Sequence, residues 1–127
     1  MSDGAFVVFS VGGQVFAAPV ADVREIVAFE RATRVPRAPP DVVGLLDLRG
    51  QVLTAVDLAR RLGLARGVAS RVLVLATDGP PVGALVDDVL DVLRTTTAAA
   101  AGASVHAPDG RPARVLDLRR ALGEEHA

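Results

Sequence analysis

The residues best suited to acid–base chemistry form one short acidic cluster, Asp87, Asp88 and Asp91. A catalytic carboxylate pair needs a cleft in which the pKa of one carboxyl group is raised. Here the acids are interleaved with Val and Leu, which is typical of a strand with one solvated face. We therefore expect these acids to lie on the solvated face of a strand, and we assign them no catalytic role.

Other reactive residue types are sparse. Neither of the two histidines, His106 and His126, has a second metal-binding residue at ligand spacing. The chain has no cysteine, its serines lie outside any nucleophile motif, and no glycine-rich phosphate loop is present. We therefore expect a protein that is not an enzyme and that uses no metal or cofactor.

Two charges point to binding instead. Glu25 precedes the apolar pair Ile26-Val27, and Arg49 follows Leu48 at a turn between two apolar runs. A charge on an apolar surface is costly unless it finds a partner. Two solutions fit the sequence: a Glu25–Arg49 ion pair across adjacent strands, or two side chains that each reach solvent. On the rim of an apolar groove such a pair would help to select a protein partner.

The composition limits the class of protein. Half of the 127 residues are apolar, which is enough for a core, and the net charge is −1. A net charge of −1 does not favour a nucleic acid as the partner. The chain also has no Trp or Tyr on which bases could stack. No apolar run approaches the roughly 20 residues that span a membrane, and no segment has the pattern of a signal peptide. We expect a cytoplasmic protein without direct membrane insertion.

Short β-prone runs separated by turn residues must position the two charges. Gly12-Gly13 and Arg49-Gly50 each predict a hairpin turn. Asp57 is placed to cap a short helix that ends at Gly63, and residues 95–103 form a low-complexity connector. The whole pattern predicts an all-β fold, a barrel or sandwich of about nine strands with two or three short helices.

The second half of one hairpin recurs near the end of the chain. Segment 50–63 matches segment 110–123 at Gly50, Asp57, Leu58, Arg60, Leu62 and Gly63. Each copy predicts a strand, an Asp cap, a short helix and a Gly stop. We expect a single domain over 1–127, built from approximate sub-barrels 15–65 and 71–123 that share strands. A groove between such units could hold a helix or hairpin of a partner.

Four ordered motifs resemble CheW-like domains, adaptors that couple chemoreceptors to the histidine kinase CheA. They are V-F-A-A-P-V-A-D-V-R-E-I, V-P-R-A-P, G-L-L-D-L-R-G-Q-V-L-T-A-V-D-L-A-R-R-L-G and G-A-L-V-D-D-V-L-D-V. The resemblance covers residues 6 to about 94 and resumes at R-V-L-D-L-R-R-A-L. It implies two intertwined five-stranded SH3-like β-barrels with short helices and no catalytic activity.

The resemblance also implies a site and partners. Val23, Glu25 and Arg49 match family positions in the receptor-binding groove between the barrels, where the Glu–Arg pair recurs. Positions that shape or line this groove match Gly44, Gly83, Val89 and Val92. The implied partners are the signalling tip of a methyl-accepting chemoreceptor and the regulatory domain of a CheA-type histidine kinase.

The leading hypothesis is a non-enzymatic signalling scaffold or adaptor in a chemotaxis-type two-component system, cytoplasmic and recruited to chemoreceptor arrays. Residues 95–102, T-T-T-A-A-A-A-G, stand where the family has a longer proline-containing segment. The alternative is therefore a stand-alone CheW-like interaction module with a reduced second barrel, which contacts one usual partner or self-assembles. A small-ligand-binding or enzymatic barrel is a third class, and it would require a polar pocket.

Overall fold

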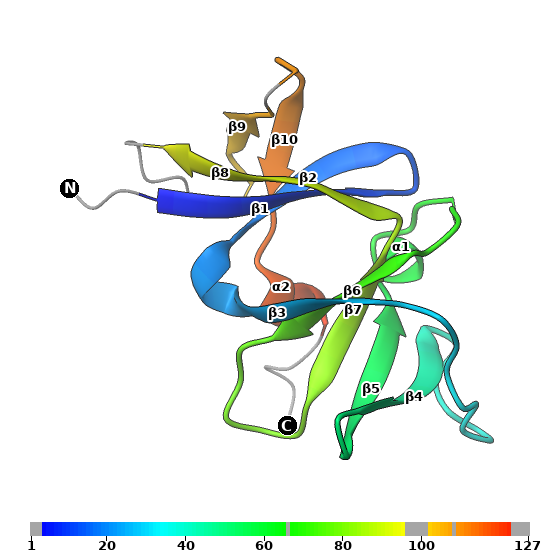
Figure 1. Cartoon of the computed structure of the whole chain (residues 1–127). Helices are drawn as coiled ribbons and strands as arrows, with labels where there is room; N and C mark the ends of the chain where they lie inside the picture. Colours follow the sequence, from blue (N-terminus) through cyan, green and yellow to red (C-terminus); the bar gives the residue numbers. More distant parts are fainter. Residues whose placement is uncertain (1–3, 66, 96–101, 108, 123–127) are drawn as a thin grey trace.

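The computed structural model describes residues 4–65, 67–95, 102–107 and 109–122, which contain ten strands and three short helices. The strands are β1 (Gly4–Val11), β2 (Gln14–Pro19), β3 (Val23–Ala28), β4 (Val42–Leu48), β5 (Gln51–Asp57), β6 (Arg71–Leu75), β7 (Val82–Val86), β8 (Asp88–Thr95), β9 (Ser104–His106) and β10 (Pro112–Val115). The helices are η1 (Val20–Asp22), α1 (Leu58–Arg61) and α2 (Leu118–Ala121). The predicted all-β fold with short helices is confirmed (Figure 1).

The strands form two five-stranded sheets. One has the order β3-β6-β7-β5-β4 and is made from one stretch of chain, so we call it the continuous sheet. The other has the order β8-β1-β2-β10-β9 and combines the first two strands with the last three, so we call it the split sheet. In Figure 1 the split sheet lies above the continuous sheet, and η1 links the two.

The sheets divide the chain differently from the predicted sub-barrels 15–65 and 71–123. Strand β1 pairs with β2 on one edge and with β8 on the other, so that Val7 lies opposite both Ala18 and Val92. The free edge of β2 is taken by β10, in parallel. The sequence repeat shows that two strand–helix units are alike. It carries no information on which distant strands pair, so the division of the strands between the two sheets could not be predicted from it.

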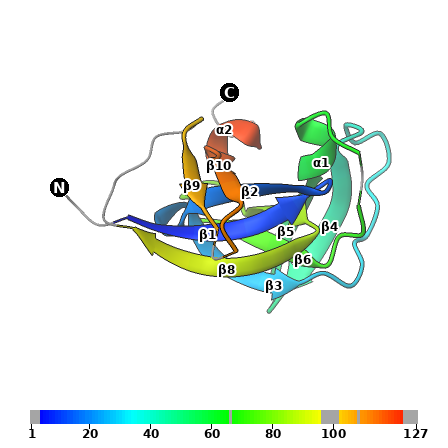
Figure 2. The ribbon, with the colours of Figure 1, turned by 90° about the horizontal axis from the view of Figure 1, so that it is seen from above.

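The repeat itself is present in the geometry. Asp57 and Asp117 cap α1 and α2, and each carboxylate accepts a hydrogen bond from the backbone N–H three residues later, at 3.3 Å. The strand before each helix runs parallel to one of its two sheet neighbours: β5 to β7, and β10 to β2. The two helices lie on the same side of the molecule (Figure 2), where Arg61 of α1 donates to the backbone carbonyls of Ala121 and Leu122.

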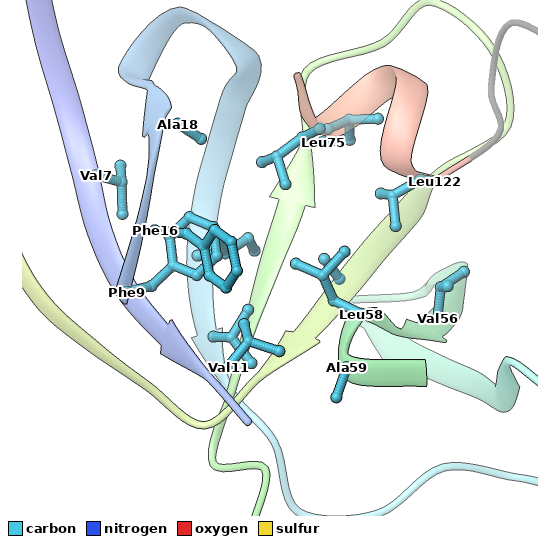
Figure 3. Close-up of a cluster of buried hydrophobic side chains, with 14 residues drawn as sticks. Val7, Phe9, Val11, Phe16, Ala18, Val56, Leu58, Ala59, Leu75 and Leu122 are labelled. Atoms are coloured by element: carbon cyan, nitrogen blue, oxygen red, sulfur yellow. The ribbon is translucent and has the colours of Figure 1, made fainter. Parts of the chain in front are cut away.

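The core lies mainly between the sheets. Its largest cluster combines Phe9 and Phe16 of the split sheet with Leu58 and Leu118, the matching leucines of the two repeat copies (Figure 3). Smaller clusters lie on the other face of each sheet, around Phe6 and Val8 in the split sheet and around Leu53 and Val72 in the continuous sheet. Since both faces are covered, strands such as β1 carry nearly continuous apolar runs.

The connector predicted at 95–103 falls largely outside the described residues, because 96–101 are not among them. The split sheet nevertheless contains five strands: β1, β2 and β8 precede residues 96–101, and β9 and β10 follow them.

Candidate functional site

Glu25 and Arg49 are in direct contact. Arg49 Nη2 donates to both carboxylate oxygens of Glu25, at 2.6 Å to Oε1 and 2.7 Å to Oε2. The Arg49 side chain is 70% exposed and that of Glu25 is 23% exposed. The guanidinium group is therefore presented to solvent, while the carboxylate anchors it from a more sheltered position. A pair this exposed contributes little to stability and is available to a partner.

One solution suggested by the sequence was an ion pair across adjacent strands. The pair is present, but it joins opposite edges of one sheet. Glu25 lies on β3 and Arg49 in the β4–β5 turn, and β3 and β4 are opposite edges of the continuous sheet. Their side chains meet only because the sheet curls until its edges approach. The strong right-handed twist of β-sheets makes such curling possible, but it cannot be read from the position of two charges in the sequence.

Two further contacts join the same edges. The backbones of Thr33 and Leu45 exchange two hydrogen bonds of 2.8 Å. Arg24 Nη2 donates to Gln51 Oε1 at 3.0 Å. We call this line of contacts the edge seam; it comprises Arg24, Glu25 and Thr33 on one side and Leu45, Arg49 and Gln51 on the other. The other members were not predicted, because Arg24 and Gln51 are exposed polar residues without a signal of a partner, and the Thr33–Leu45 contact is made by backbone groups.

The backbone of Arg49 is strained. Its φ is 52° and that of Gly50 is 81°, so the two residues form the tight turn that joins β4 to β5. A left-handed conformation favours Gly or Asn and costs an arginine about 1–2 kcal/mol. Asp47 supports the turn, since its Oδ1 accepts a hydrogen bond from Gly50 N at 3.1 Å. The strain is retained at the residue that reaches Glu25, which is the pattern expected of a functional position.

The valines assigned to the groove lie in two environments. Val23 on β3 and Val89 on β8 are partly buried and pack against the core cluster between the sheets. Val92 is 56% exposed on β8, which is an edge strand of the split sheet. Val23 and Val89 therefore contribute to the junction of the sheets, whereas Val92 offers apolar surface to solvent.

The two glycines are buried in the continuous sheet. A Cβ at Gly44 would lie 2.3 Å from the carbonyl oxygen of Thr33, across the edge seam. A Cβ at Gly83 would lie 2.5 Å from Val72 Cγ1. Both positions need glycine for close packing, and neither residue is exposed to solvent.

The three acids of the acidic cluster each accept a hydrogen bond from a backbone N–H group. Asp87 lies between β7 and β8, and its Oδ2 accepts a 3.4 Å hydrogen bond from Gly13 N in the first hairpin turn. Asp88 and Asp91 are exposed, and each accepts a bond from the next backbone N–H. The part of the chain that the structure describes contains no group of acids and histidines able to hold a metal ion.

None of the described helices is long and apolar enough to cross a membrane.

Comparison with known proteins adds a family context. The profile of the CheW-like domain family matches residues 5–126. The "Probable chemotaxis protein CheW" of Rhizobium etli is 39% identical over 97 residues, 74% of this chain and 63% of that protein. Chemotaxis protein CheW of Rhizobium meliloti is 41% identical over 90 residues, 68% of this chain and 58% of that protein. The matched part thus spans about three fifths of the length of these curated relatives.

A solved structure has the same fold. The scaffolding protein TtCheW from Thermoanaerobacter tengcongensis superposes with a TM-score of 0.80 over 93% of this chain and 86% of that chain. The sequence identity is 22%, so this likeness speaks for the fold alone.

Proposed function

Because this chain belongs to the family of CheW-like domains, we propose that it is a non-enzymatic signalling adaptor that couples chemoreceptors to a CheA-type histidine kinase. The observation that carries the proposal is the family match over residues 5–126, with relatives named as chemotaxis proteins. The proposed partners are a receptor signalling tip and a kinase regulatory domain. The proposed location is the cytoplasm, at receptor arrays.

The Glu25–Arg49 pair is the proposed centre of receptor binding, together with Val23 and Val92 as apolar contacts and with Val89, Gly44 and Gly83 shaping the surroundings. Arg49 uses Nη2 for Glu25, and a guanidinium group carries five N–H donors. Donors remain for the polar side chains or carbonyl groups of a helical hairpin tip. Glu25 fixes the direction of the guanidinium before the partner arrives, which lowers the entropy lost on binding.

The adaptor proposal is tested by measuring binding of the purified chain to two separate probes from the same cell. These are a receptor fragment that contains the signalling tip and the regulatory domain of the CheA-type kinase. We expect both to bind at micromolar concentration and to form a ternary complex. Failure to bind either probe at that concentration would contradict the proposal.

Arg49→Ala should separate binding from stability. The pair is exposed, so its loss should change the free energy of unfolding by only about 0–1 kcal/mol. Binding of the receptor tip should weaken about tenfold or more, because a desolvated charged contact is lost. Urea denaturation and titration of the labelled receptor fragment measure the two effects.

Arg49→Asn is the matched control, because Asn tolerates the left-handed conformation of the turn while removing the guanidinium group. It should be at least as stable as the native chain and should bind the receptor tip as poorly as Arg49→Ala. Kinase binding should persist in both variants. Unfolding of both variants without a separate binding defect would show that Arg49 is structural.

A further inference from the structure

A second surface carries arginine side chains other than Arg24 and Arg49. Two adjoining surface cavities, of about 540 and 400 Å³, share Arg34, Pro40, Val42 and Val43 in their walls. The larger is also lined by Arg60 of α1, and the smaller by Arg37. We call this surface the arginine cavities. Their walls combine guanidinium groups with valine, alanine and proline.

The charges of the arginine cavities are not balanced within the described chain. Among described residues, the guanidinium groups of Arg34, Arg37 and Arg60 form no ion pair, whereas neighbouring Arg61 is paired with Asp41. The carboxylate in the wall, Asp57, is 7% exposed and caps α1 through Arg60 N. The walls thus carry three guanidinium groups and one carboxylate, a net positive charge.

The walls are held in place before any ligand binds. A turn at Pro36-Arg37 is closed by a hydrogen bond from Ala38 N to the carbonyl oxygen of Val35 at 3.2 Å. The loop is then tied to β5, since Asp57 N donates to the carbonyl oxygen of Asp41 at 2.7 Å. Such pre-organisation reduces the entropy lost on binding.

Arg37 adopts the left-handed conformation, with φ of 65°. It shares this strain with Arg49, the other non-glycine residue with positive φ in the described chain. At Arg49 the strain is accompanied by an ion pair with Glu25. Arg37 has no such partner in the described chain. Arg37 thus combines a strained backbone with a place in the cavity wall, and strained residues of this kind cluster at ligand-binding sites.

We propose that the arginine cavities bind an acidic, extended segment of a partner protein, one that alternates carboxylate and aliphatic side chains. Carboxylates match the planar fork of arginine, and Val42, Val43 and Pro40 can accept the aliphatic side chains. An extended segment can cover both adjoining cavities, whereas a single inorganic anion would leave the apolar walls uncovered. None of the residues proposed for the receptor site lines these cavities, and the proposal does not depend on that site.

The test uses the full chain and a fluorescein-labelled peptide, Glu-Leu-Glu-Pro-Val-Glu-Leu-Glu, with a matched peptide in which Gln replaces every Glu. Fluorescence anisotropy at low salt should show saturable binding of the acidic peptide only. Arg34→Gln, at the shared wall, should weaken binding about fivefold or more, as expected for a charged contact. Arg114→Gln, an exposed arginine on β10 of the split sheet, is the matched control and should change affinity less than about twofold.

Three outcomes would overturn the proposal: equal losses for Arg34→Gln and Arg114→Gln, binding of the Gln peptide as tight as that of the Glu peptide, or equal binding of a single-stranded oligonucleotide of the same charge. Backbone amide NMR shifts should be confined to residues 32–43 and the neighbourhood of Arg60. Arg34→Gln should leave receptor-tip binding unchanged, so failure here is distinguishable from failure of the adaptor proposal.

Discussion

Replacing Leu58 by alanine should lower the free energy of unfolding by about 2–5 kcal/mol. Leu58 is completely buried in the cluster that joins the two sheets. Truncation removes apolar contacts and leaves a cavity that close-packed neighbours fill only in part. Urea denaturation followed by circular dichroism measures the change.

The repeat supplies matched variants for this prediction. Leu118→Ala removes the equivalent leucine of the second copy, which is also fully buried, and should cost a similar amount. Val52→Ala, at a side chain that is 56% exposed, should change stability by less than about 0.5 kcal/mol. If Leu58→Ala costs no more than Val52→Ala, the core between the sheets is not organised as described.

Gly44→Ala should destabilise the chain by about 2–4 kcal/mol, through strain and overpacking together. A Cβ there would lie 2.3 Å from a backbone oxygen of Thr33, and φ at this position is 153°. A backbone oxygen cannot rotate away from the new methyl group as a flexible side chain can. The hydrogen-bonded bridge between Thr33 and Leu45 must therefore shift. Thermal unfolding should report the loss, and hydrogen exchange should show faster exchange of the Leu45 amide.

Gly63→Ala is the control for strain without a clash. Gly63 has φ of 71°, but nothing lies within 4 Å of a Cβ built on it. It should therefore cost only the conformational penalty of about 1–2 kcal/mol. Equal costs for the two substitutions would mean that contact with Thr33 is unimportant.

Local features were predictable from the sequence because they depend on neighbours in the chain. The hairpin turn at Gly12-Gly13 and the caps at Asp57 and Asp117 follow from residue types whose backbone or hydrogen-bonding preferences are strong. The fold class followed from the spacing of short apolar runs. The resemblance to a known family then implied two five-stranded units, a number that spacing alone did not provide.

Long-range features were not predictable in the same way. The β1–β8 and β2–β10 pairings join distant segments, and several arrangements of equally apolar strands would satisfy the same pattern. For the same reason, the Glu25–Arg49 pair was placed across adjacent strands although its partners lie at opposite sheet edges. The resemblance singled out Gly44, but the residue pattern did not predict its packing contact, because Thr33 comes near only when the opposite edges of the sheet approach each other.

The division into a continuous and a split sheet has a consequence for how the chain folds. Strands β3 to β7 follow one another, so their sheet can form as soon as residue 86 is available. The β1–β2 hairpin must wait for β8 and β10, and the pairing of Ala17 with Val115 closes nearly the whole described chain into a loop. Such high contact order slows folding. During synthesis the hairpin emerges before its sheet partners β8 and β10, with the backbone groups of both strand edges unpaired, which exposes it to misassociation.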